Sequence, residues 1–81
     1  MLRVTEGRDK NIVGANVRKY RKLHGLSQQQ LADKLETMAI YICRGSVSRV
    51  EDKLRTVTDI EAAGIAETLG VSIQDLFAAE E

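Results

Sequence analysis

The sequence predicts a small all-α domain built from five short helices. Apolar residues recur at helical spacing through most of the chain. The 81 residues contain no proline and six glycines, several of which stand where a helix should stop, and this favours short helices joined by tight turns. A chain of this length forms one domain with a thin core. We therefore expect a single unit over residues 1–81, with an N-terminal arm (1–11), a helical core (12–77) and an acidic tail (78–81).

The first helix is expected at residues 12–24, and the second is expected to start after Ser27 and continue past Leu35. The residues of the first that recur at helical spacing, and should point inward, are Val13, Val17, Tyr20 and Leu23. Gly25 is suited to end that helix as a C′ residue. Ser27 and Gln30 form a capping box that opens the second helix. The residues that keep its apolar register are Leu31, Leu35 and Met38.

The third helix is expected at residues 44–52, after an extended connector of β-branched and aromatic residues (40–43). Its inward face is expected to consist of Val47, Val50 and Leu54. Its outward face is small, polar and basic, and consists of Arg44, Gly45, Ser46, Ser48 and Arg49. A helix that is slim on one side and carries guanidinium groups there suits the major groove of DNA. This pattern indicates gene control rather than catalysis.

Two further helices are expected in the C-terminal part of the chain. Thr58 and Glu61 form a second capping box, which opens a fourth helix that ends before Gly70. The residues expected to form its core face are Ala62, Ile65, Ala66 and Leu69. Ser72 should cap a fifth helix over residues 73–79.

The net charge is zero, but the charges are unevenly distributed along the chain. All twelve lysines and arginines, with six of the acids, lie in residues 1–55, whereas the other six acids lie in residues 56–81 without a base. A bipolar molecule of this kind can present one attractive face to phosphate and keep the other face away. The acidic half is explained equally well as a solubilising surface.

The composition excludes several classes of protein. The single cysteine, Cys43, cannot form an internal disulfide, so a reducing cytoplasm is the expected setting. Cys43 and the single histidine, His24, are too few for a zinc site, and no metal, cofactor or small-molecule ligand is expected. No segment resembles a signal peptide or a membrane span. The sequence shows no nucleophile–base pair and no phosphate-binding glycine loop, so an enzyme is not expected.

Five sequence segments, taken in order, resemble the phage-repressor and Cro type of helix-turn-helix domain, the xenobiotic-response-element family. They are VRKYR (17–21), GLSQ (25–28), LA (31–32), VSRVE (47–51) and LGVSIQDLF (69–77). Each segment is common, but five in this order are hard to obtain by chance. The resemblance implies a repressor-like domain that binds double-stranded DNA as a transcriptional regulator. It also implies a homodimer that associates through its C-terminal helix, with half-sites about one helical turn (~34 Å) apart or a multiple of it. Repression is expected rather than activation, because a chain this short has no evident room for an effector pocket or a polymerase-contacting domain.

The resemblance also implies roles for particular residues. The positions expected to contact base edges are Arg44, Gly45, Ser46, Ser48 and Arg49, although the two serines could equally touch phosphate or simply keep the helix slim. The positions that contact phosphate are Gln28, Gln29, Lys53 and Arg55, although Gln29 equally suits plain surface. Arg21 and Glu51 match a pair that commonly forms a buried ion pair between the first and third helices. Their expected role is structural.

Three features depart from the pattern of the family. The stretch from Leu35 to Val47 is longer by about five residues than in the commonest form, which resembles a subgroup with a longer second helix. Cys43 stands at the N-cap of the third helix, where Ser or Thr is usual, and a thiol is a weaker cap. Gly45 offers no side chain to a base. Either the backbone approaches DNA closely at Gly45, or specificity depends on fewer residues.

Some residues keep two interpretations. Cys43 could serve as a redox switch, but packing as a small hydrophobic residue is favoured. Met38 and Ile42 are expected to cover the core beside the third helix, whereas Tyr41 could equally face a partner. The exposed face of the first helix, expected to be solvated, carries Arg18, Lys19 and Lys22. The alternative function is a protein-binding module, such as an antitoxin or antirepressor, that uses the acidic half and the apolar turn.

Overall fold

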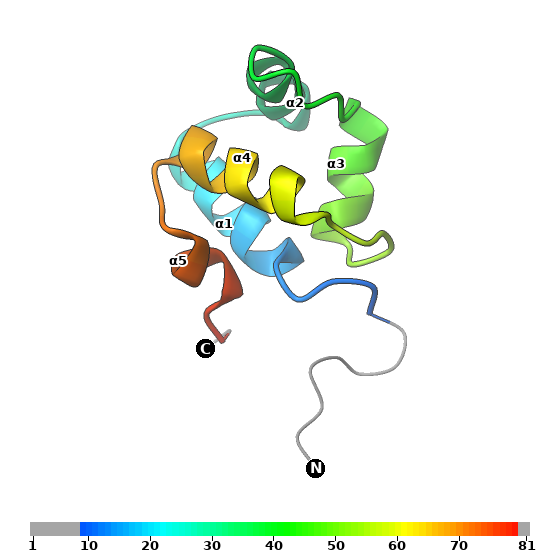
Figure 1. The fold of residues 1–81 in the computed structure, drawn as a ribbon, viewed down its shortest axis with the longest axis vertical. Helices are drawn as coiled ribbons and strands as arrows, with labels where there is room; N and C mark the ends of the chain where they lie inside the picture. The colour runs from blue at the N-terminus through cyan, green and yellow to red at the C-terminus, as the bar shows by residue number, and fades with distance from the viewer. Residues whose placement is uncertain (1–8, 80–81) are drawn as a thin grey trace.

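The computed structural model describes residues 9–79, in which five helices follow one another along the chain (Figure 1). They are α1 (Gly14–Leu23), α2 (Gln28–Glu36), α3 (Arg44–Glu51), α4 (Asp59–Leu69) and α5 (Ile73–Phe77). No strand occurs among the described residues, and the predicted all-α fold with five helices is confirmed. Most of the expected arm and part of the acidic tail lie outside the described residues. No described helix has the length and apolarity needed to cross a membrane.

The helix ends follow local signals in the sequence. Complete capping boxes open three helices, through Ser27 and Gln30 at α2, Thr58 and Glu61 at α4, and Ser72 and Asp75 at α5. Gly25 follows His24, the C-cap of α1, and Gly70 is the C-cap of α4; both lie in the left-handed region, with φ of 67° and 66°. Glycine adopts this conformation without steric cost, and so both helices stop where predicted. At α3 the N-cap residue Cys43 makes no side-chain capping bond.

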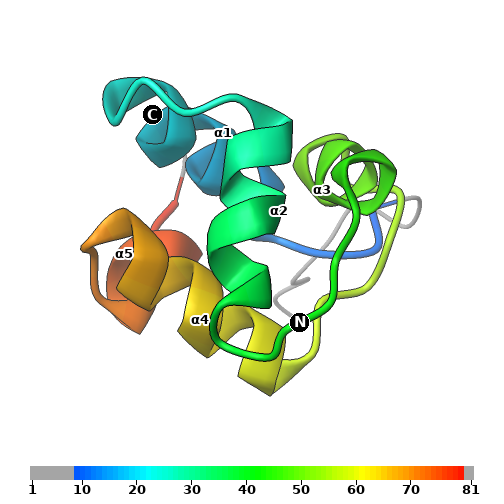
Figure 2. The same ribbon diagram turned by 90° about the horizontal axis from the view of Figure 1, so that it is seen from above.

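The helices surround one apolar core. Figure 2 shows α3 on one side of α2, with α4 and α5 on the other, and α1 packs against α3, α4 and α5. The largest fully buried side chains come from all five helices or their borders and are Val13, Val17, Leu31, Leu35, Val47, Val50, Leu69 and Leu76. Burial of one such side chain contributes about 1.5–3 kcal/mol. Because Val47 and Val50 fix only the inner side of α3, the core leaves its other side uncovered.

Three side chains expected to face inward are exposed. Leu23, at the end of α1, is 71% exposed because the chain turns at Gly25 before any element covers it. Leu54 is 63% exposed because it lies in the loop after α3 and no longer follows the helical register. Met38 lies in the turn after α2 rather than on the helix, and is exposed for the same reason. The end of α5 was also misplaced, at residue 79 instead of Phe77.

The additional residues between α2 and α3 form a turn, not an extension of the second helix. Ala39, with φ of 61°, takes a left-handed conformation after the end of α2. Ile40 packs so closely on Gly64 of α4 that a Cβ at Gly64 would collide with its Cδ1. Ile42 is buried, as predicted, whereas Tyr41 is 77% exposed. Ile40 and Ile42 therefore fix the turn to the rest of the domain.

Candidate nucleic-acid interface

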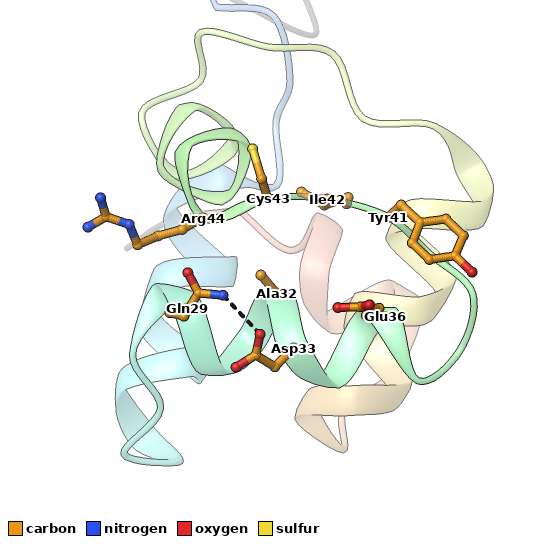
Figure 3. Close-up of a pocket in the computed structure, with 8 residues that line it drawn as sticks. All are labelled: Gln29, Ala32, Asp33, Glu36, Tyr41, Ile42, Cys43 and Arg44. Atoms are coloured by element: carbon orange, nitrogen blue, oxygen red, sulfur yellow. Dashed lines mark hydrogen bonds between the residues drawn. The ribbon is translucent and has the colours of Figure 1, made fainter.

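The outward side of α3 carries the polar and basic residues that the sequence indicated. Arg44 and Arg49 are exposed, and neither forms an ion pair or a side-chain hydrogen bond within residues 9–79. Gly45 is exposed between them, while Ser46 and Ser48 are half-buried. The guanidinium of Arg44 projects into solvent at the start of the helix (Figure 3). The arrangement is a narrow helical surface with two guanidinium groups available to an external acceptor.

The first turn of α3 has room for a larger residue than glycine. The nearest atom to a Cβ built at Gly45, outside the helix's own backbone, is the sulfur of Cys43 at 4.0 Å. Packing within the described residues therefore does not require glycine here. Cys43 is exposed rather than packed as a small hydrophobic residue, because it ends the connector at the surface. Its Sγ lies 3.5 Å from Oγ of Ser46, and the hydrogen bond that this hydroxyl gives the thiolate lowers the pKa of the Cys43 thiol.

The two glutamines at the start of α2 are engaged within the protein. Nε2 of Gln28 donates to Oε1 of Glu51 at 3.2 Å. Nε2 of Gln29 donates to Oδ1 of Asp33 at 2.9 Å. Both side chains lie beside α3, since α2 and α3 pack together. A phosphate contact from either side-chain amide would accordingly compete with an internal hydrogen bond.

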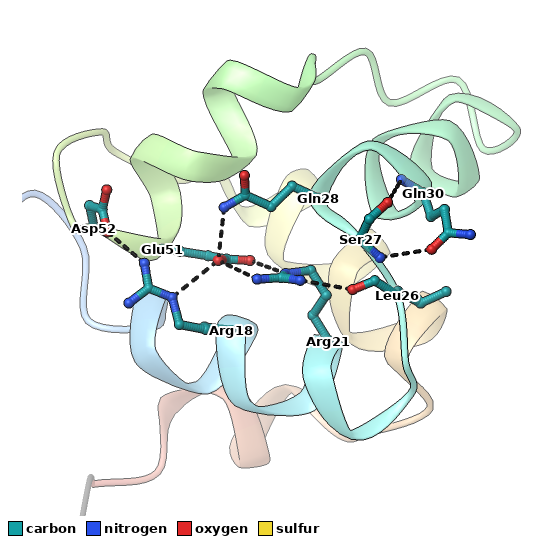
Figure 4. Close-up of polar contacts among 8 residues, drawn as sticks. All are labelled: Arg18, Arg21, Leu26, Ser27, Gln28, Gln30, Glu51 and Asp52. Atoms are coloured by element: carbon teal, nitrogen blue, oxygen red, sulfur yellow. Dashed lines mark hydrogen bonds and ion pairs between the residues drawn. The ribbon is translucent and has the colours of Figure 1, made fainter.

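Arg21 and Glu51, which the resemblance paired, lie together between α1 and α3 (Figure 4). Nε of Arg21 lies 2.6 Å from Oε2 of Glu51, and Nη2 lies 3.0 Å from Oε1. The remaining nitrogen of the same guanidinium, Nη1, donates a hydrogen bond to the carbonyl oxygen of Leu26 at 2.8 Å. The Glu51 side chain is completely buried. A buried charge needs such a partner, because desolvation of an unpaired ion is costly.

Arg18 also belongs to this cluster, although it was not among the residues predicted for the site. Its Nε lies 3.2 Å from Oε1 of Glu51 and its Nη2 lies 2.6 Å from Oδ1 of Asp52. Burial by itself raises the pKa of Glu51, but hydrogen bonds from Arg21, Gln28 and Arg18 together hold that pKa below its ordinary value. The available signal was the spacing of Arg18 and Arg21, because residues three apart share one face of a helix.

The two other residues expected to contact phosphate, Lys53 and Arg55, lie in the loop after α3 and have acidic partners. Arg55 forms a two-pronged pair with Glu61, with Nη1–Oε1 and Nη2–Oε2 distances of 3.0 and 2.9 Å. This pair lowers the pKa of Glu61 and ties the loop to the start of α4. Because the guanidinium is engaged in this way, a phosphate contact from Arg55 would compete with its pair with Glu61. Lys53 has its Nζ 3.9 Å from Oδ2 of Asp9.

Asn11 is a second residue that was not among those predicted for the site. Its Nδ2 donates to the carbonyls of Val50 and Arg55 at 3.0 and 2.8 Å. Its Oδ1 accepts from the backbone N–H groups of Val13 and Gly14 at 3.2 and 2.9 Å. This buried amide joins the start of α1 to the end of α3. Because these partners are backbone groups, no side-chain pattern in the sequence pointed to them.

A pocket of about 370 Å³ lies between α2 and the segment that leads into α3 (Figure 3). Its lining residues are Gln29, Ala32, Asp33, Glu36, Tyr41, Ile42, Cys43 and Arg44. Tyr41 and Arg44 point in opposite directions from this segment, so Tyr41 does not extend the surface formed by Arg44. No group of three or more metal-binding side chains occurs in the part of the chain that the structure describes.

Both the sequence and the fold of this chain are similar to those of known proteins. The helix-turn-helix family matches residues 17–76. The restriction-modification controller protein C.AhdI from Aeromonas hydrophila is similar, with a TM-score of 0.70, 29% identity, and coverage of 80% of this chain and 87% of that chain. SinR, a master regulator for biofilm formation in complex with DNA, gives a TM-score of 0.71, 25% identity, and coverage of 82% and 98%. The DNA-binding domain of BldD gives a TM-score of 0.70 and 27% identity, with coverage of 91% of this chain and 99% of that chain. None of the curated proteins matches this sequence.

Proposed function

This chain belongs to the helix-turn-helix family, and on that premise we propose that it regulates transcription by binding double-stranded DNA through α2 and α3. The observation that carries the proposal is the outward side of α3, where Arg44 and Arg49 stand without an internal partner among residues 9–79. Similar folds belong to a controller protein, to a master regulator in complex with DNA and to a DNA-binding domain. The domain acts by binding rather than by catalysis.

In this proposal α3 enters the major groove and contacts base edges. Arg44 and Arg49 each suit guanine, because a guanidinium donates two parallel hydrogen bonds to O6 and N7. Gly45 lets the backbone approach the bases, since there is no side chain to hold it away. Ser46 and Ser48 keep the helix slim between the arginines.

Contacts to phosphate would position the domain without selecting sequence. We assign these contacts to Gln28, Gln29 and Lys53. The start of α2 adds the positive end of its helix dipole, which favours an anion. The side-chain amide of Gln28 would exchange its bond to Glu51 for a phosphate oxygen when DNA binds. Arg55 is left out because Glu61 holds its guanidinium.

We further propose that the protein is a dimer that represses transcription by occupying its operator. Two apolar side chains of α5, Ile73 and Phe77, are partly exposed, and Phe77 borders a groove of about 470 Å³ beside Ala62 of α4. A second copy packed on α5 would cover this surface and present two α3 helices to a two-fold operator. A regulator of this kind works beside DNA, and we propose the cytoplasm as its location.

The direct test is binding to a fluorescent random-sequence duplex, titrated with salt from low to physiological concentration. We expect the logarithm of affinity to fall linearly with the logarithm of salt concentration, with a slope of several units, because neutralised phosphates release their counterions. A folded protein that shows no binding at low salt would overturn the proposal. A protein-binding module would then be the next hypothesis.

A second measurement tests the assignment of α3. On a selected operator, Arg44→Ala and Arg49→Ala should each weaken binding by about 1–3 kcal/mol and relax base preference. Lys34→Ala is the matched control, since Lys34 is an exposed base in the last turn of α2, away from the surface we assign. Equal affinity of all three variants would show that Arg44 and Arg49 do not contact the bases.

A further inference from the structure

Arg18 bridges two carboxylates at the C-terminal end of α3. Its Nη2 lies 2.6 Å from Oδ1 of Asp52, the C-cap residue of α3, and its Nε lies 3.2 Å from Oε1 of Glu51. The two acids differ in environment, because the Glu51 side chain is completely buried and the Asp52 side chain is 48% exposed. The bridge comes from α1, which lies outside the pair of helices assigned to DNA.

The end of α3 concentrates negative charge. Glu51 and Asp52 each carry a carboxylate, and the C-terminus of a helix adds a partial negative charge. Arg21 supplies one compensating cation, which makes two hydrogen bonds with Glu51. Without Arg18, one carboxylate charge would remain unbalanced on the exposed side of this cluster.

This charge matters because of its place beside the surface that we assign to DNA. Asp52 is followed directly by Lys53, to which we assign a phosphate contact. A carboxylate within about 10 Å of a phosphate repels it at low salt, and the repulsion fades as the ionic strength rises. Arg18 lies close enough to Asp52 to cancel most of this repulsion, since opposite charges in contact present a dipole rather than a net charge.

We propose that Arg18 is a positioning residue that holds and neutralises Asp52, so that the DNA backbone can approach the C-terminal end of α3. The inference rests on the proposed function and adds to it a residue of α1 that acts through another side chain. Two other roles for Arg18 predict different results. A direct contact to phosphate would make the arginine itself indispensable, whereas a purely structural link would make stability and affinity fall together.

The test compares Arg18→Met, Asp52→Asn and the double variant on one duplex, at about 50 mM salt and again near physiological salt. Methionine keeps most of the length of arginine and removes its charge. We expect Arg18→Met to weaken binding by about three- to tenfold at low salt and by less at higher salt. Asp52→Asn should bind at least as tightly as the natural chain. The double variant should recover to within about twofold of it, because the charge balance is restored.

Lys19→Met is the matched control for the loss of one positive charge from α1. Lys19 is exposed on the same helix, and its Nζ lies over the ring of Tyr20 at 5.1 Å rather than on an acid. It should bind DNA like the natural chain. Thermal unfolding of each variant separates a loss of affinity from a loss of structure.

The possible results are distinct. Recovery in the double variant supports the proposal. A double variant as weak as Arg18→Met would mean that Arg18 contacts DNA itself or supports the fold, and would overturn it. Unchanged affinity of Arg18→Met would overturn it as well. If the natural chain itself bound no duplex at low salt, the proposed function would be wrong. That result differs from a failure of the Arg18 proposal alone, in which the natural chain still binds DNA.

Discussion

Arg21 of α1 and Glu51 of α3 form a buried ion pair with two hydrogen bonds, of 2.6 and 3.0 Å, across 30 positions of sequence. The same carboxylate accepts a third hydrogen bond from Gln28 of α2, at 3.2 Å. One side chain thus links α1 to the two helices assigned to DNA, α2 and α3. Such a link restrains the angle between α2 and α3, on which simultaneous contact with phosphate and bases depends.

Replacement of Glu51 by alanine is expected to lower the free energy of unfolding by about 3–5 kcal/mol. The variant would leave the guanidinium of Arg21 buried with only the carbonyl of Leu26 as a partner, and an uncompensated buried charge is strongly destabilising. Urea unfolding measures the change. Glu67→Ala is the control, because Glu67 is an exposed acid of α4 and should change stability by about 0.5 kcal/mol or less. Equal stability of the two variants would contradict the importance of the pair.

Acid is expected to destabilise the protein through Glu51 and Glu61. Burial raises the pKa of Glu51, but its hydrogen bonds outweigh this effect, and hydrogen bonds from Arg55 lower the pKa of Glu61. Each group therefore binds its proton more weakly in the folded chain than in the unfolded one. Its stabilisation is complete above the unfolded pKa of about 4.3 and is lost as the pH falls through the lower folded pKa.

Urea midpoints measured from pH 7 down to pH 2 would follow this loss. The Glu51→Gln variant should show a shallower dependence on pH below about pH 4, because one of the two linked groups no longer titrates. An increase in stability on acidification, or an unchanged slope in the variant, would contradict the assignment.

The helix boundaries could be predicted because their determinants are local. A capping box needs two residues three positions apart, and the ends of α1 and α4 each need one glycine. The inward faces could be predicted where the helix continued, as at Val47 and Val50. The same periodicity failed at Leu54, because the helix had already ended and nothing covers that side chain.

Residues whose partners are distant in sequence could not be identified in this way. Asn11 bonds to backbone groups 39 and 44 positions away, and Arg18 bonds to Asp52 across 34 positions. Neither residue differs in type from ordinary surface residues. The spacing of Arg18 and Arg21 places both on one face of α1, but only the packing of α1 against α3 shows that Arg18 reaches Asp52. Arg55 shows the converse. It lies in the loop where a phosphate contact was expected, but its guanidinium pairs with Glu61 within the fold.

Dimer formation through α5 is expected to depend on Phe77. Phe77→Ser should convert a dimer, measured by sedimentation at rising protein concentration, into a monomer, because serine removes apolar area from the proposed contact. Affinity for a two-half-site operator should fall with it, while affinity for a single half-site should not. Leu23→Ser is the control, since Leu23 is an exposed apolar residue at the end of α1. A natural chain that stays monomeric throughout would refute dimerisation through this helix.

Gly45→Ala separates the two explanations for a glycine on the DNA-facing side of α3. The protein has room for the methyl group, since the nearest atom outside the helix's own backbone lies 4.0 Å from it. Alanine also favours a helix over glycine by up to about 1 kcal/mol, so the variant should melt no lower than the natural chain. We expect its affinity for DNA to fall by about tenfold or more, because a methyl group would hold the backbone away from the bases. Ser48→Ala, which removes an atom from the same face, should weaken binding less. If Gly45→Ala bound as tightly as the natural chain, close approach at Gly45 would be excluded, and base recognition would depend on the arginines alone.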